Sequence, residues 1–304
     1  MPFLRIGTRG SKLALFQARL VRDLLCQAHD IVAADIEIIT IKTTGDRVTD
    51  RPLAEIGGKG LFTKEIEEAL FEDKIDIAVH SMKDMAAFLP DGLGIAAVLK
   101  REDPRDAFLS NQDNAIDELP LGAKIGCSSV RRTAQLLSKR PDLKIHPFRG
   151  NLDTRISKLK SGEVDGTFLA TAGLNRLGLE NEITQKLEIF EMLPAPAQGI
   201  IGIETRNNAE KIYDLLKSIN HHQTQIQMEA ERGFLQGVDG SCRTPVAAHA
   251  IIQDQSIKLM AEALTLDGTQ VFKVEQAGDA ADARKLGFEA AKKIKIESAG
   301  VLTL

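Results

Sequence analysis

The sequence predicts an α/β protein with two domains built on mostly parallel sheets, followed by a smaller α+β domain. Apolar runs of strand length alternate with amphipathic stretches of helical length, which is typical of sheets covered by helices. The 304 residues are more than one hydrophobic core usually organises and suit two or three domains. Two proline-containing segments, KREDPRD (100–106) and PAPAQG (194–199), separate the sets of elements.

The first domain is expected from four apolar runs and two helical stretches. The strands are expected at residues 4–7, 35–42, 76–80 and 94–99, with helices at 11–28 and 62–73. The spacing in the first helix predicts that four residues form its buried stripe: Leu13, Phe16, Leu20 and Leu24. The run GIIGIE (199–204) is too short to begin a domain, so we expect it to return to the first sheet. Domain 1 is therefore predicted as residues 1–99 with 200–219.

The second domain, residues 100–199, repeats the alternation of strands and helices. Its strands are expected near 106–110, 123–127, 143–147 and 166–170, with helices near 130–139 and 151–161. The third domain, residues 220–304, is expected to place helices near 222–236 and 281–297 around strands such as PVAAHAII (245–252). PAPAQG is the predicted hinge.

Composition limits the classes of function. A net charge of -4 argues against nucleic acid as the partner, because proteins that bind it usually carry a basic excess. The first residues, MPFLRIGTRG, do not form a signal peptide, and no apolar run reaches membrane-spanning length. Three widely spaced cysteines predict neither a disulfide framework nor a metal site, so we expect a cytoplasmic protein without a bound metal.

Cys242 is the cysteine best placed for chemistry. It lies in GSCRTP (240–245), a turn bounded by glycine and proline that holds a thiol near the surface beside Arg243. Partly exposed thiols in an electropositive setting are the reactive ones. Cys26 falls off the apolar stripe of its helix and is interpreted as a bystander, whereas Cys127 ends a strand and could line a site.

Arginines recur where strands are expected to end and helices to begin. Four such turns contain Arg9 with Ser11, Ser129 with Arg131 and Arg132, Arg149 with Arg155, and Arg176. Ligands of open parallel sheets bind at the carboxyl ends of the strands, where helix N-termini favour anions and arginine binds carboxylate or phosphate. A single arginine of this kind is usually surface decoration, but four in equivalent places predict a site for a polyanion.

Two further segments could complete this site. IGGKGLF (56–62) has neither the GK[ST] of a phosphate loop nor a GxGxxG fingerprint, so Lys59 is interpreted as a mobile charge on a lid or on a solvated loop. Lys83 and Asp84 follow the strand DIAVH (76–80). Asp84 could act as an acid or base or stabilise a developing cation, or it could simply start a helix.

The motifs together identify the chain as a member of the porphobilinogen deaminase family. The matching segments are GTRGSKLAL, GDRVTDRPLAEIGGKGLFTKEIEEAL, DIAVHSMKD, REDPRDAF, SSVRR, RPDL, RGNLDTR, LATAGLNRLGL and the cysteine turn. The resemblance implies two domains like the type II periplasmic binding proteins and a third, smaller α+β domain. It also implies a monomeric enzyme that joins four porphobilinogen molecules into hydroxymethylbilane and releases ammonia at each step.

The resemblance assigns a role to each candidate residue. Cys242 would carry a dipyrromethane cofactor through a thioether, and Asp84 would be catalytic by stabilising the azafulvene cation and removing a proton. The residues implied to hold the cofactor are Lys83, Ser129, Arg131, Arg132 and Arg155. The residues implied to bind substrate or intermediate carboxylates are Arg9, Ser11, Arg149 and Arg176. Lys59 and Phe62 would belong to the lid, and Gln198 to the hinge side of the site.

The sequence departs from the family pattern at position 127, and two other classes of function are alternatives to the family's activity. Position 127 often holds threonine in this family, and here it is Cys127. A non-catalytic binding module would share the first two domains, but the sequence has no export signal and no DNA-binding helix pair. An acyl- or phosphoryl-transfer enzyme using Cys242 would need a base beside the thiol, and the sequence offers no obvious one.

Overall fold

The computed structural model describes residues 3–47, 60–112, 114–240 and 244–302. Within these ranges the contacts divide the chain into two compact units. The first contains residues 3–47, 60–102 and 200–225, and the second contains 103–199 and 226–302 within the described ranges. None of the helices in these ranges is both long enough and apolar enough to cross a membrane.

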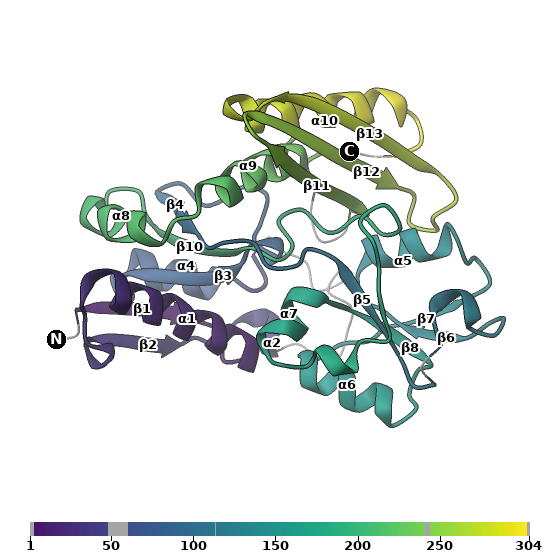
Figure 1. The fold of residues 1–304 in the computed structure, drawn as a ribbon, viewed down its shortest axis with the longest axis horizontal. Coiled ribbons are helices and arrows are strands. Elements are labelled where there is room, and N and C mark those ends of the chain that lie inside the picture. The colour runs from purple at the N-terminus through teal and green to yellow at the C-terminus, as the bar shows by residue number, and fades with distance from the viewer. Residues whose placement is uncertain (1–2, 48–59, 113, 241–243, 303–304) are drawn as a thin grey trace. The chain divides into compact units, whose positions relative to one another are not determined.

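The first unit is built on a five-stranded sheet in the order β2-β1-β3-β10-β4 (Figure 1). Its strands are β1 (Leu4–Thr8), β2 (Ile36–Thr40), β3 (Ile77–Ser81), β4 (Leu93–Val98) and β10 (Ile201–Arg206). β1 runs parallel to β2 and β3, whereas β10 is antiparallel to both β3 and β4. The expected return of the chain to this sheet after residue 199 is thus confirmed.

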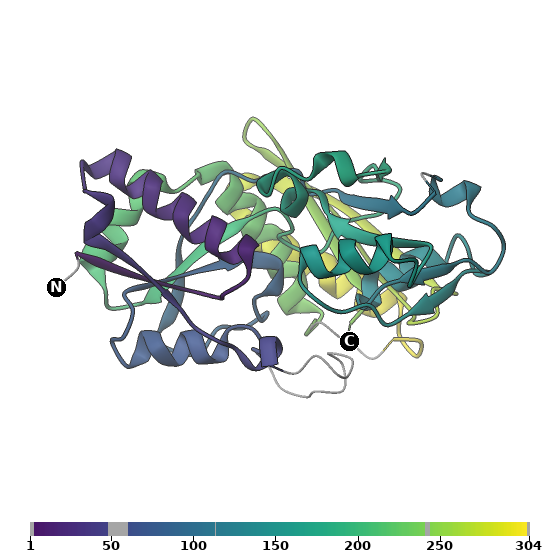
Figure 2. The same cartoon turned by 90° about the horizontal axis from the view of Figure 1, so that it is seen from below.

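Helices cover both faces of this sheet, because successive apolar side chains along its strands point to opposite faces. The described residues of the unit include the helices α1 (Lys12–His29), α2 (Thr44–Arg47), α4 (Lys64–Phe71) and α8 (Glu210–Leu216). Ile77 and Val79 of β3 pack with α1, whereas Ala78 between them packs with α4. Figure 2 shows α1 and α4 on opposite sides of the strands.

Leu20 and Leu24 of the stripe predicted for α1 pack, partly buried, against the core, but the fully buried stripe lies one residue further along the helix. The buried residues are Gln17, Ala18, Val21 and Leu25, whereas Phe16 is 37% exposed. Gln17 faces inward because its amide donates to the Ser81 hydroxyl at 2.9 Å and accepts from it at 3.3 Å. The buried apolar residues Ala18, Val21 and Leu25 are also at helical spacing, so the sequence offered two neighbouring stripes, and the buried one also carries the Gln17–Ser81 contact.

The second unit begins with a sheet in the order β7-β6-β8-β5-β9. Its strands are β5 (Asp106–Ser110), β6 (Lys124–Gly126), β7 (Lys144–His146), β8 (Gly166–Ala170) and β9 (Gln185–Lys186). α5 (Val130–Leu137) packs on one face, and α6 (Leu152–Lys160) with α7 (Thr171–Arg176) pack on the other. β5 is antiparallel to β8 and β9, so this sheet has the same arrangement as the first. In each sheet four strands run in the same direction, as expected, and one strand, β10 or β5, runs against them.

The C-terminal part of the second unit is an antiparallel sheet in the order β11-β12-β13 (Figure 1). Its strands are β11 (Val246–Gln253), β12 (Ser256–Leu264) and β13 (Val271–Asp279). α9 (His222–Gly237) and α10 (Ala283–Glu297) share one hydrophobic core with these strands. The expected fold class, two α/β sheets followed by an α+β part, is confirmed.

Candidate active site

The first unit contains a pocket that brings together several predicted residues. Its polar lining comprises Arg9, Ser11, Gln17, Thr63, His80, Ser81 and Asp84, and Phe62 also lines it. Asp84 is exposed and lies in a short 3-10 helix, Met82–Asp84, directly after β3, with half-buried Lys83 beside it. We call this the Asp84 pocket. Strand β3 ends here, as the sequence predicted.

Arg9 is held in this pocket from two directions. Its guanidinium donates to the Asp46 carboxylate, with Nη2–Oδ1 at 2.5 Å and Nε–Oδ1 at 3.2 Å. The same guanidinium lies over the Phe62 ring, 4.3 Å from its centroid, at a distance typical of a cation–π contact. Burial opposes ionisation of Asp46, but the hydrogen bonds and positive charge of Arg9, together with hydrogen bonds from Thr43, outweigh it and lower the pKa of the carboxyl.

Ser11 caps the N-terminus of α1. Its hydroxyl accepts from the Ala14 backbone N–H at 3.2 Å and so satisfies one of the free donors at the start of α1. The start of this helix lines the pocket through Ser11, Leu13 and Ala14. A helix N-terminus with an arginine beside it favours a bound anion.

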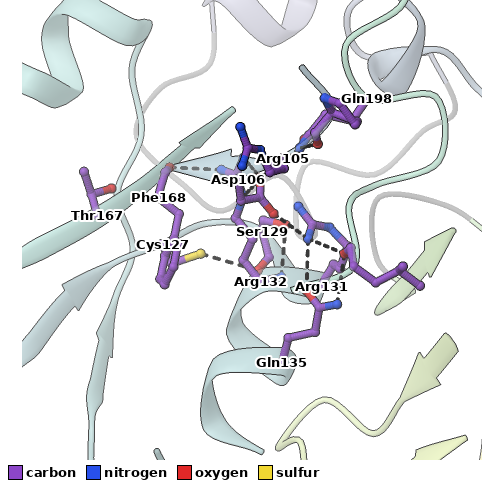
Figure 3. Close-up of polar contacts among 12 residues, drawn as sticks. Arg105, Asp106, Cys127, Ser129, Arg131, Arg132, Gln135, Thr167, Phe168 and Gln198 are labelled. Atoms are coloured by element: carbon purple, nitrogen blue, oxygen red, sulfur yellow. Dashed lines mark hydrogen bonds and ion pairs between the residues drawn. The ribbon is translucent and has the colours of Figure 1, made fainter. Parts of the chain in front are cut away.

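The second unit contains a cluster of three predicted arginines, two of which are buried beside one acid. Arg131 and Arg132 of α5 both reach Asp106, which is fully buried at the start of β5 (Figure 3). Nη1 of Arg131 lies 2.7 Å from Oδ2 of Asp106, and Nη2 of Arg132 lies 2.7 Å from Oδ1. Arg132 and Arg155 both donate to the Phe168 carbonyl, at 2.9 and 2.8 Å. We call Asp106, Arg131, Arg132 and Arg155 the guanidinium cluster.

Burial and neighbouring charges shift the pKa of two groups in this cluster, Asp106 and Arg155. Burial would raise the pKa of Asp106, but Arg131 and Arg132 outweigh it and hold this pKa well below its ordinary value. Desolvation, with repulsion from Arg132, lowers the pKa of Arg155 to about 10. The Nε atoms of Arg131 and Arg155 are buried and have no hydrogen-bond partner among the described residues. The cluster therefore has an excess of positive charge and unused donors.

Other predicted residues lie around this cluster. The Gln198 amide donates to Oδ1 of Asp106 at 2.9 Å and to the Pro104 carbonyl at 2.7 Å. Ser129 caps α5 by accepting from the Arg132 backbone N–H at 3.4 Å. Cys127 is buried, with its thiol 3.5 Å from the Ser129 carbonyl oxygen (Figure 3). Ser129 therefore contacts both the start of α5 and Cys127 directly after β6.

Arg176 and Arg149 are the two remaining predicted arginines. Arg176, at the end of α7, donates to the Gly199 carbonyl at 2.6 Å, one residue from Gln198. Arg149 is half-buried between β7 and α6. Cys242 and Lys59 lie outside the described residues.

Sequence reasoning missed three residues that complete these sites: Asp46, Asp106 and Gln135. An available signal for Asp106 was the acid at the start of the apolar run DAFLS (106–110), since a charge opening a buried strand needs a partner. Gln135 accepts from Nη1 of Arg131 at 2.9 Å and is four residues further along α5, a helical spacing that the sequence does reveal. No comparable signal pointed to Asp46.

The chain is similar in sequence to one family along most of its length. The family profile described as "Porphobilinogen deaminase, dipyromethane cofactor binding domain" matches residues 4–214, and "Porphobilinogen deaminase, C-terminal domain" matches 225–296. A porphobilinogen deaminase of Paracoccus denitrificans is 52% identical over 292 residues, 96% of this chain and 93% of that protein. One of Nitrobacter hamburgensis is 49% identical over 295 residues, 97% and 93% of the two chains.

Solved structures give a more distant similarity. The VFT2 domain of BvgS from Bordetella pertussis is 14% identical with a TM-score of 0.43, covering 71% of this chain and 85% of that one. The arginine-specific periplasmic binding protein STM4351 of Salmonella typhimurium is 13% identical with a TM-score of 0.40, covering 72% and 92%. Neither similarity is close enough to bear on the chemistry.

Proposed function

Because the chain belongs to the porphobilinogen deaminase family, we propose that its guanidinium cluster holds a dipyrromethane cofactor and that Asp84 is its catalytic carboxylate. Enzymes of this family act in tetrapyrrole biosynthesis, where they condense porphobilinogen into hydroxymethylbilane and release ammonia. The observation that carries the proposal is the excess of positive charge in the guanidinium cluster.

The residues present fit a dipyrromethane. Each of its two pyrrole rings bears an acetate and a propionate, so the group presents several carboxylates close together. The guanidinium cluster contains three guanidinium groups and one carboxylate, and two of its Nε donors have no partner among the described residues. Arginine binds carboxylates through its planar fork of donors, which makes these side chains suitable ligands.

In this account Arg131, Arg132, Arg155, Ser129 and Lys83 hold the carboxylates of the cofactor, and Cys242 anchors it through a thioether. When bound, the cofactor supplies the free pyrrole position on which the chain is extended. A thiolate is a better nucleophile than a hydroxyl at neutral pH, which supports a cysteine at the anchor. Since Cys127 is buried and Cys26 is half-buried on α1, neither competes well with a turn cysteine for this role.

Asp84 has two tasks in the reaction. Loss of ammonia from porphobilinogen leaves an electron-poor cation on the substrate, and a fixed carboxylate stabilises such a charge as it develops. The same carboxylate can accept the proton that the attacking ring must lose. Its exposure in a pocket that also contains Arg9 and Ser11 supports contact with a substrate.

The remaining predicted residues bind the carboxylates of incoming substrate and of the growing chain. We assign Arg9, Ser11, Arg149 and Arg176 to this role, Gln198 to the hinge side of the site, and Lys59 with Phe62 to a lid. The Arg9 guanidinium is already oriented by Asp46 and Phe62, so it loses less conformational freedom when it binds an anion.

Three properties of the whole protein complete the proposal. The family supports a cytoplasmic, monomeric enzyme with three domains: residues 1–99 with 200–219, residues 100–199, and residues 220–304. Light scattering of the purified protein tests the monomer, and limited proteolysis with mass mapping of the fragments tests the boundaries. A mass of twice the chain, or first cleavages inside a predicted domain, would contradict these assignments.

The proposed function is tested by incubating the purified protein with porphobilinogen and measuring ammonia and linear tetrapyrrole together. The account predicts four ammonia molecules for each hydroxymethylbilane formed. A binding module would instead retain porphobilinogen without releasing ammonia. Folded protein that binds porphobilinogen but releases no ammonia would therefore contradict the proposed function.

A further inference from the structure

The Gln135 side chain connects Arg131 of the guanidinium cluster to the C-terminal sheet. Its Oε1 accepts from Nη1 of Arg131 at 2.9 Å, and its Nε2 donates to the Leu193 carbonyl at 2.9 Å and to Oε1 of Glu262. An arginine can only donate and an ionised carboxylate can only accept. The amide therefore has one orientation that satisfies both neighbours, with its oxygen toward Arg131 and its nitrogen toward Glu262.

Glu262 is an unusual residue for its position. It lies on β12 and is only 7% exposed, and burial of a carboxylate is costly unless it is hydrogen-bonded or paired. Lys273 opposes it in the register of β12 and β13, with Nζ at 3.9 Å from Oε2. The hydrogen bond from Gln135 is the closer contact and joins this carboxylate to α5.

The turn between β12 and β13 packs on the same helix. A Cβ atom added at Gly268 would lie 2.2 Å from the Ala134 carbonyl oxygen, so the backbone of the turn rests directly on the residue before Gln135. Gly268 also has φ of +72°, a conformation that other residues adopt at a cost. Two contacts, one of side chains and one of backbone, therefore tie this hairpin to the helix that carries Arg131 and Arg132.

We propose that Glu262 is a positioning residue for Arg131: it orients the Gln135 amide, and that amide orients the guanidinium toward the carboxylates of the cofactor. This inference rests on the proposed role of Arg131. Arg131 has three partners on one nitrogen, namely Asp106, Leu193 and Gln135, and they hold Nη1 in place. The other donors of the fork can then be presented in a fixed direction, which is what bidentate recognition of a carboxylate needs.

A double-mutant experiment separates positioning from a general effect on folding. Full-length protein is produced without cofactor in cells that cannot make porphobilinogen, porphobilinogen is added, and intact mass follows the gain of dipyrromethane. We expect Glu262→Leu to slow this gain at least fivefold, because the amide loses the acceptor that orients it. Glu262→Gln should stay within twofold of the wild type, because an amide oxygen still accepts the hydrogen bond.

Two controls accompany these variants. Glu275 is the matched acid on β13, since it is exposed and pairs with Lys258 of β12 at 2.7 Å, and Glu275→Gln should leave the rate unchanged. In an Arg131→Leu background, Glu262→Leu should slow the gain of mass by less than a further twofold, because there is no guanidinium left to position. Gln135→Met removes the hydrogen bonds to both Arg131 and Glu262, so it should also slow the gain of mass. It serves as the test if Glu262→Leu does not fold.

The outcomes distinguish the inference from the proposed function. Normal cofactor gain in Arg131→Leu alone would overturn the role of Arg131 and the inference with it. Impaired gain in Arg131→Leu, together with a normal rate in folded Glu262→Leu or Gln135→Met, would overturn only the inference. Equal slowing by Glu262→Leu with and without Arg131, accompanied by a lower Tm, would show that Glu262 acts on folding and would also overturn it.

Discussion

Arg132 and Arg155 donate hydrogen bonds to the same acceptor, the backbone carbonyl oxygen of Phe168, at 2.9 and 2.8 Å. Two like charges thus meet at one oxygen, where desolvation and Arg132 lower the pKa of Arg155 to about 10. An arrangement of this kind opposes folding when the site is empty of anions, because each charge raises the free energy of the other. It becomes favourable when carboxylates are bound between the guanidinium groups.

The first prediction is that Arg155→Met separates stability from function. In protein made without cofactor, the change should leave the free energy of unfolding unchanged or raise it, because an apolar stem replaces a repelled, desolvated charge. The rate of cofactor gain should nevertheless fall. Urea unfolding of the apo variant together with intact mass after addition of porphobilinogen checks both parts. A large loss of apo stability with normal cofactor gain would contradict the account of this residue.

Asp106→Asn should have the opposite effect on stability. Removing the carboxylate leaves Arg131 and Arg132 buried without their counter-charge, and breaking a buried pair in this way costs about 3–5 kcal/mol. Urea unfolding at neutral pH measures the loss. Asp214→Asn, which removes an exposed pair with Lys217, is the control and should change stability much less.

The same variant carries a prediction about pH. Because the folded protein lowers the pKa of Asp106, the carboxylate stabilises the fold above about pH 3.9, the ordinary value for aspartate, and this contribution is lost as pH falls below it. The difference in unfolding free energy between wild type and Asp106→Asn should therefore narrow in acid. A difference that stayed constant between pH 7 and pH 3 would show that Asp106 does not act through its charge.

The arginines should divide into two groups when each is replaced by leucine. Arg131→Leu and Arg132→Leu should impair assembly of the cofactor, since both side chains belong to the guanidinium cluster. Arg149→Leu and Arg176→Leu should load the cofactor normally and stall during elongation. Mass spectra after limited porphobilinogen would display the stalled intermediates. Identical behaviour of all four variants would argue against separate roles.

Much of the fold was predictable because the alternation of strand-like and helix-like segments, and the residues typical of turns, are local signals. The order of strands and helices followed from such patterns, and the return of β10 to the first sheet followed from its length. The direction of β5 and β10 was not predictable, since antiparallel pairing depends on where the chain crosses between sheets. The rotation of α1 was missed because two neighbouring apolar stripes have helical spacing, and only the tertiary fold decides that Ala18, Val21 and Leu25 face the core.

The sequence predicted which arginines belong to the candidate site, but it did not predict the residues that they contact. Arginines in strand-to-helix turns were visible in the sequence, and the structure brings Arg131, Arg132 and Arg155 together. Asp106 and Glu262 were not assigned, because their contacts join residues 26 and 127 positions apart. Such pairings are decided by the tertiary fold, and no local pattern encodes them.

Asp84→Asn should leave folding and cofactor loading intact while reducing turnover about a hundredfold or more, the usual scale for a positioned acid or base with an electrostatic role. The side chain keeps its size and loses its charge. Asp84→Glu should keep more activity, although the added methylene displaces the carboxylate. Rates of ammonia release from holo-protein give the comparison. If the Asn variant turned over at nearly the wild-type rate, another carboxylate would have to stabilise the substrate cation, which would contradict the role of Asp84.

The intact mass of the purified protein, compared between wild type and Cys242→Ser, tests the central claim most directly. The account predicts that the wild type is heavier than its sequence by one dipyrromethane, that Cys26→Ser keeps this added mass, and that Cys242→Ser lacks it, because a hydroxyl is a far weaker nucleophile than a thiolate. Colour with Ehrlich's reagent should follow the added mass. A normal adduct on Cys242→Ser, or its loss only in Cys127→Ser, would contradict the assignment.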